Sequence, residues 1–150
     1  MSNMNNNNIK NNNNFMSLRL FAKAGNEAFA RTCVAAFAAK LDPCLDQIDD
    51  IKTAVSEAVS NSIVHAQLNE NEFVTIDVLL DGNAVHITVS DEGVGIADVG
   101  EALKPFFTTK ADQERSGLGF TLMAAFMDSL DVVAMDKGVA VKMTKNIKSA

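Results

Sequence analysis

Two alternating segments on either side of a short turn constrain the fold more than any other feature of this sequence. Residues 73–80 and 84–90 each place apolar side chains at every second position, which is the period of a half-buried strand. Asp81-Gly82-Asn83 between them is a hairpin turn signal. The apolar positions of the two strands are Val74, Ile76, Val78, Val85, Ile87 and Val89. A hairpin with one apolar face has to bury that face under a second layer.

The remaining segments supply that layer and more strands. Helices are expected over residues 27–41 and 45–66, with Asn26 as the cap of the first and Asp42-Pro43 as its stop signal. A third helix is expected over 118–130. Further strands are expected over residues 15–20, 132–134 and 139–143, the last two around the turn Asp136-Lys137-Gly138. The sequence therefore predicts an α+β fold: a two-layer α/β sandwich whose mixed, mostly antiparallel sheet carries helices on one face.

Length and charge restrict the class of protein. The 150 residues are enough for one domain, which we place at 15–150. Residues 1–14 are dominated by Asn and are predicted to form a disordered leader. The net charge of −6 disfavours direct binding to nucleic acid. No apolar run reaches the roughly 20 residues that span a membrane, and no signal peptide is recognisable, so we expect a cytoplasmic protein with Cys33 and Cys44 as free thiols.

The first group of candidate functional residues lies on the helix expected over 45–66. At about 100° per residue, Thr53, Glu57, Asn61 and His65 form one stripe. An amide oxygen can ligate a hydrated Mg²⁺, while a carboxylate one turn away orients a water molecule or takes a proton. The polar outer face of an ordinary amphipathic helix accounts for the same pattern.

The second group is Asp91-Glu92-Gly93-Val94-Gly95, directly after a predicted strand. Gly93 and Gly95 allow a ligand to approach the backbone closely. The carboxylate of Asp91 could accept a hydrogen bond from an exocyclic amine such as that of adenine. A plain turn is the alternative interpretation.

The third group precedes and begins the helix expected over 118–130. Gly117 and Gly119 expose backbone N–H groups at a helix start, where phosphate binds well. Lys110 and Arg115 could neutralise phosphate charge. The order of residues is neither that of a P-loop nor that of a dinucleotide-binding fingerprint. A flexible surface loop followed by a helix cap is again the alternative.

Together, the three groups resemble the ATP site shared by gyrase, heat-shock chaperones, mismatch-repair proteins and histidine kinases. Within that superfamily the sequence is most similar to the anti-sigma factors of endospore-forming bacteria, and the similarity covers about residues 15–147. The stretches that carry it are 27–31 (Glu-Ala-Phe-Ala-Arg), 41–43 (Leu-Asp-Pro), 56–61 (Ser-Glu-Ala-Val-Ser-Asn), 91–93 (Asp-Glu-Gly), 107–110 (Phe-Thr-Thr-Lys) and 114–120 (Glu-Arg-Ser-Gly-Leu-Gly-Phe).

This resemblance implies a fold of the histidine-kinase-like ATPase type and a dimer that inhibits a sporulation sigma factor. It also implies that the protein phosphorylates a serine of an anti-anti-sigma protein with ATP and Mg²⁺. Glu57 would be the catalytic base, Asn61 the Mg²⁺ ligand and Arg31 a partner-binding residue. The implied nucleotide-binding residues are Asn61, Asp91, Gly93, Gly95, Thr108, Thr109, Lys110, Arg115, Gly117, Leu118 and Gly119. The sequence departs from the family pattern at Ala66, where relatives often have Gly, and at Val139, where many have Thr.

Other functions share these motifs. A histidine kinase catalytic domain would contain them, but the histidines His65 and His86 fall in the Asn helix and in a strand rather than on a spare helix. A serine kinase for a stress sigma factor would also contain them. A non-catalytic module, in which ATP or ADP only selects the partner, belongs to a different class. A structural domain with coincidental loops is the least specific alternative.

Overall fold

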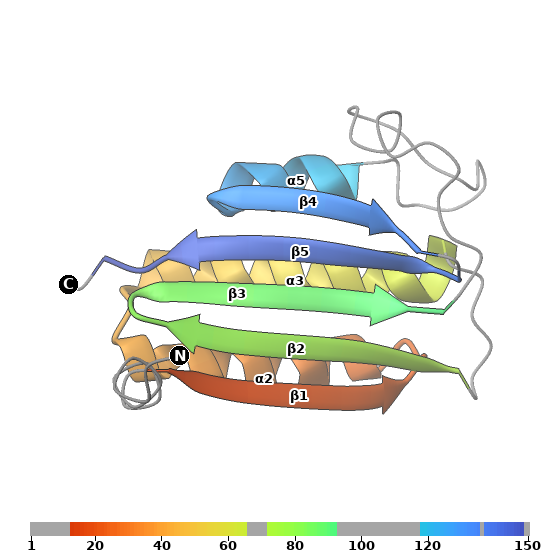
Figure 1. The fold of residues 1–150 in the computed structure, drawn as a ribbon, viewed down its shortest axis with the longest axis horizontal. Helices are drawn as coiled ribbons and strands as arrows, with labels where there is room; N and C mark the ends of the chain where they lie inside the picture. The colour runs from red at the N-terminus through yellow and green to blue at the C-terminus, as the bar shows by residue number, and fades with distance from the viewer. Residues whose placement is uncertain (1–12, 66–71, 93–117, 136, 149–150) are drawn as a thin grey trace, which may run out of the picture.

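The computed structural model describes residues 13–65, 72–92, 118–135 and 137–148. A five-stranded sheet has the order β1-β2-β3-β5-β4, every neighbouring pair is antiparallel, and the helices cover one face (Figure 1). The predicted two-layer α+β architecture is confirmed. The elements are β1 (Asn14–Phe21), α2 (Asn26–Ala38), the short 3-10 helix η1 (Ala39–Leu41), α3 (Leu45–His65), β2 (Phe73–Asp81), β3 (Ala84–Asp91), α5 (Leu118–Phe126), β4 (Ser129–Ala134) and β5 (Val139–Asn146).

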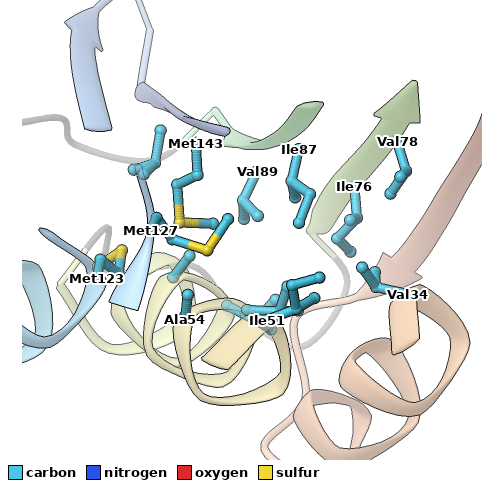
Figure 2. Close-up of a cluster of buried hydrophobic side chains, with 14 of the residues drawn as sticks. Val34, Ile51, Ala54, Ile76, Val78, Ile87, Val89, Met123, Met127 and Met143 are labelled. Carbon is cyan, nitrogen blue, oxygen red and sulfur yellow. The ribbon is translucent and has the colours of Figure 1, made fainter. Parts of the chain in front are cut away.

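The predicted central hairpin is confirmed as β2 and β3. Asp81 pairs with Ala84 across the turn, and Gly82 adopts the positive φ of 60° that this turn requires. The apolar positions that alternate along both strands are buried against the helices. Figure 2 shows Ile76, Val78, Ile87 and Val89 of these strands above the helical layer. Burying each such side chain contributes about 1.5–3 kcal/mol, so this hairpin anchors the core.

The start of α2 differs from its prediction. Gly25 takes the N-cap position and makes no side-chain cap hydrogen bond. Asn26 lies inside the helix, and its Nδ2 donates to the carbonyl oxygen of Phe21 at 2.8 Å. The stop signal is confirmed, because Asp42 has left-handed backbone with a φ of 55° immediately before Pro43. Asn26 therefore ties the helix to the end of β1 instead of capping it.

The helix predicted over 118–130 was too long. α5 ends at Phe126, and Ser129 and Leu130 belong to β4. The Asp128 N–H donates to the Thr144 carbonyl at 2.8 Å, which begins the pairing of this segment with β5. Pairing with β5 outweighs helix propensity here, because it gives the backbone N–H and C=O groups of Ser129 and Leu130 hydrogen-bond partners in the sheet. Among the described residues, no helix is long and apolar enough to cross a membrane. The Asn-rich residues 1–12 lie outside the described part of the chain.

Candidate functional site

Glu57 and Asn61 both lie on α3, one turn apart, on the side that meets the start of α5. Asn61 is only 9% exposed and Glu57 is half-buried. A polar outer face would leave both side chains in water, so that alternative does not describe this stripe. The opposite side of the helix carries Ile51 and Val55 into the core, which fixes the direction in which the polar pair points.

Gly119 at the start of α5 stands directly against this pair. A Cβ atom on Gly119 would lie 2.9 Å from Nδ2 of Asn61 and 3.2 Å from Oε2 of Glu57. The bare backbone of the helix start therefore lies beside a carboxamide and a carboxylate. Backbone N–H groups at a helix start attract phosphate, and the neighbouring side chains are the kind of oxygen donors that Mg²⁺ prefers.

Asp91 at the end of β3 forms the second part of the site, together with Gly138. The Asp91 side chain is buried, with 5% of the residue exposed. Gly138, in the turn between β4 and β5, has a φ of 81°. A Cβ atom there would lie 2.0 Å from the Asp91 carbonyl oxygen and 2.8 Å from its Oδ1. Only glycine fits this position, so Gly138 shapes the surroundings of the Asp91 carboxylate.

The sequence predicts Gly138 as a turn residue directly before Val139, where the chain departs from the family pattern, and it does not predict the contact of Gly138 with Asp91. Its position after a strand and before apolar residues gave no sign of the contact with Asp91, which arises because β3 and β5 are neighbours in the sheet. Figure 1 shows that the end of β3, the β4–β5 turn, the C-terminal end of α3 and the start of α5 all lie at one end of the molecule. The described candidate residues therefore gather on one side of the fold.

Several predicted site residues lie outside the described residues, and Leu118 is placed only as the first residue of α5. Those that remain predictions from the sequence are Gly93, Gly95, Thr108, Thr109, Lys110, Arg115 and Gly117. The described residues contain no cluster of three or more His, Cys, Asp or Glu side chains suited to a metal. Asn61 and Glu57 nevertheless fit an Mg²⁺ ion that arrives with phosphate oxygens, since Mg²⁺ commonly uses only one or two protein oxygens.

Arg31, the predicted partner-binding residue, lies on α2 away from Gly119 and belongs to a separate polar cluster. Its Nη1 donates to Oε2 of Glu27 at 2.9 Å and to Oγ of Ser56 at 3.3 Å. The Ser56 hydroxyl donates to the same Glu27 oxygen at 2.7 Å. Ser56 directly precedes Glu57, so α3 presents adjacent residues to α2 and to α5. The Arg31 side chain remains 39% exposed.

Comparison with known proteins places this geometry in a family. The sequence profile of the histidine kinase-like ATPase domain matches residues 21–145. An anti-sigma F factor of Thermoanaerobacter sp. strain X514 is 52% identical over 137 residues, which is 91% of this chain and 96% of that protein. The chain belongs to the anti-sigma F factor family. Further members come from Caldanaerobacter subterraneus, with 53% identity over 90% of this chain and 95% of the relative, and from Geobacillus kaustophilus, with 51% over 89% and 93%.

A solved structure supports the fold of this anti-sigma F factor family member. The crystal structure of the RsbU and RsbW domains of a Mycobacterium tuberculosis protein matches with a TM-score of 0.66 and 16% identity. The match covers 89% of this chain and 32% of the Mycobacterium tuberculosis chain. The family's ATPase domain implies nucleotide binding. His86 lies on β3, with Nδ1 3.0 Å from the Thr144 hydroxyl, and not on a helix.

Proposed function

We propose that this chain binds and inhibits a sporulation sigma factor and, with ATP and Mg²⁺, phosphorylates a serine of an anti-anti-sigma protein. The observation that carries the kinase half is the close approach of Gly119 to Asn61 and Glu57. It joins a phosphate-binding helix start to an amide ligand and a carboxylate in one place. Family membership and the nearby Asp91–Gly138 contact support a nucleotide whose adenine end lies at β3.

Phosphoryl transfer mainly requires positioning and stabilisation of charge. When bound with ATP, Mg²⁺ would supply positive charge that neutralises the phosphate groups. The Asn61 carboxamide would hold that ion, and the backbone at Gly119 would donate to phosphate oxygens. The serine oxygen attacks the γ-phosphorus, ADP leaves, and Glu57 accepts or aligns the proton of the serine hydroxyl.

The exposed side of α2 is the surface that we expect to bind the protein partners. Glu27 and Ser56 hold the Arg31 guanidinium in place, yet the side chain is partly open to solvent. A guanidinium has five N–H donors, so donors remain for a partner. We propose that Arg31 contributes to the surface that contacts the sigma factor and the anti-anti-sigma protein, with a homodimer as the assembled form.

The test is transfer of radiolabel from γ-labelled ATP to the anti-anti-sigma protein. Glu57→Ala should keep ATP binding and lose transfer. The reason is that Glu57 acts on the proton of the serine hydroxyl, whereas Asn61 holds the Mg²⁺ that binds with the nucleotide. Asp49→Ala is the matched control, since Asp49 is an exposed acidic residue on the same helix. Transfer at the native rate by Glu57→Ala would refute the catalytic role. Tight nucleotide binding by the native protein without any transfer would instead identify a nucleotide-gated binding module.

A further inference from the structure

α3 and α5 pack side by side and run in opposite directions (Figure 1). At one end of their interface Gly119 of α5 approaches Glu57 of α3. At the other end Lys145 of β5 joins the same two helices. Its Nζ donates to Oδ2 of Asp50 on α3 at 2.9 Å and to the carbonyl oxygen of Phe126, the last residue of α5, at 2.6 Å. The helix pair is therefore held at both ends.

The two contacts match in spacing. Glu57 follows Asp50 along α3 by the same number of residues as Phe126 follows Gly119 along α5. At 1.5 Å per residue, each separation is about 10 Å. The helices are antiparallel, so the Lys145 contact forms at one end of the pair and the Gly119 contact at the other. Both contacts are made at the same position of α5 along the axis of α3. A slide of α5 would disturb both.

Flexible and small apolar side chains lie between these contacts. Met123 of α5 and Met127, which directly follows that helix, are buried in the same core as the small Ala54 and Ala58 of α3. Figure 2 shows Met127 next to Met143 of β5, close to Ala54. Methionine is unbranched and adapts to different neighbours. The polar contact through Lys145 joins α3, α5 and β5 and is more directional than such apolar contacts.

The surroundings of Lys145 suit this task. Its side chain is only 12% exposed, and that of Asp50 is 29% exposed. The last carbonyl groups of a helix lack partners within the helix, and a cation at that end is favoured by the helix dipole. We propose that Lys145 is a positioning residue: by fixing the C-terminal end of α5, it sets where Gly119 lies relative to Asn61. The effect of Lys145 on nucleotide binding rests on the proposed function, whereas its effect on the position of α5 does not.

The first measurement follows α5 without nucleotide. Lys145→Met keeps the length and apolar stem of the side chain but removes both hydrogen bonds. Hydrogen–deuterium exchange at residues 122–124, whose N–H groups bond to the carbonyl groups of the first turn, should become about tenfold faster, because that turn opens more often when the far end of α5 is released. Lys142→Met, an exposed position on the same strand, is the control and should exchange like the native protein. Native exchange rates in Lys145→Met would overturn the proposal.

The second measurement compares ATP with adenosine by calorimetry. In Lys145→Met the ATP affinity should fall about tenfold, because small displacements of binding groups are costly. Adenosine affinity should remain, since Asp91 and Gly138 lie on other elements. Unchanged ATP affinity, or an equal loss for both ligands, would overturn the positioning role. If the native protein bound no ATP, the proposed function would be wrong. The hydrogen-exchange result would still test the role of Lys145 in holding α5.

Asp50→Asn covers the case in which Lys145→Met does not fold. This variant removes the ionic partner on α3 but leaves the hydrogen bond from Lys145 to Phe126 intact. We expect a smaller increase in exchange at residues 122–124 and a smaller loss of ATP affinity, both in the same direction. Native values of exchange in Asp50→Asn, with Lys145→Met unfolded, would overturn the proposal.

Discussion

Replacing Gly119 with alanine separates the stability of α5 from the chemistry at its first turn. Alanine is favoured over glycine in a helix by up to about 1 kcal/mol. The new Cβ atom would lie 2.9 Å from Nδ2 of Asn61 and 3.2 Å from Oε2 of Glu57. Both atoms end flexible side chains, which must move by a few tenths of an ångström or leave their rotamers at a cost of about 0.5–1.5 kcal/mol. The two effects nearly cancel.

We therefore expect Gly119→Ala to unfold within about 2–4 °C of the native protein, since 1 kcal/mol corresponds to that shift for a chain of this size. Binding of ATP with Mg²⁺ should nevertheless weaken by about 10–100-fold, the usual effect of disturbing a residue that orients a metal ligand. The loss follows because the displaced group is the Asn61 carboxamide, the proposed ligand. Adenosine, which would contact only the Asp91 end, should bind as before.

Calorimetry with ATP and Mg²⁺, calorimetry with adenosine, and thermal unfolding together test this expectation. Gly25→Ala is the matched control, because a Cβ atom at Gly25 would meet nothing within 4 Å. That variant should keep native binding of both ligands. Native affinity for ATP with Mg²⁺ in Gly119→Ala would show that the position of the Asn61 carboxamide does not matter for binding, and the reasoning about the phosphate end would be wrong.

Two further substitutions test other contacts. Gly138→Ala should lower the free energy of unfolding by about 2–4 kcal/mol and abolish adenosine binding, because its φ of 81° and the 2.0 Å approach to the Asp91 carbonyl both exclude a side chain; native adenosine affinity would contradict this. Ser56→Ala should lower stability to urea by about 1–2 kcal/mol through loss of the hydrogen bond to Glu27. Ser60→Ala, on the same helix, is its control, and equal stability of the two variants would argue against that bond.

Local patterns predicted most of the fold. The alternation of residues 73–80 and 84–90 and the Asp-Gly-Asn turn specified β2 and β3 because strand periodicity and turn geometry are properties of neighbouring residues. The helix predicted over 118–130 failed at its end because Ser129 and Leu130 pair with β5, a partner distant in sequence. The predicted cap at Asn26 failed for a similar reason, since its amide bonds to Phe21 instead.

Residue type and spacing alone predict that Glu57 and Asn61 fall one turn apart on a helix, that Asp91 ends a strand, and that Gly119 lies in the first turn of another helix. Three contacts could not be predicted in this way: Gly119 meets Glu57 and Asn61, Gly138 lies against Asp91, and Lys145 joins α3 to α5. The physical reason is that residue type and spacing fix periodicity, hydrogen-bonding capacity and charge. Contacts between distant elements depend on how the sheet order and the packing of the whole core bring those elements together.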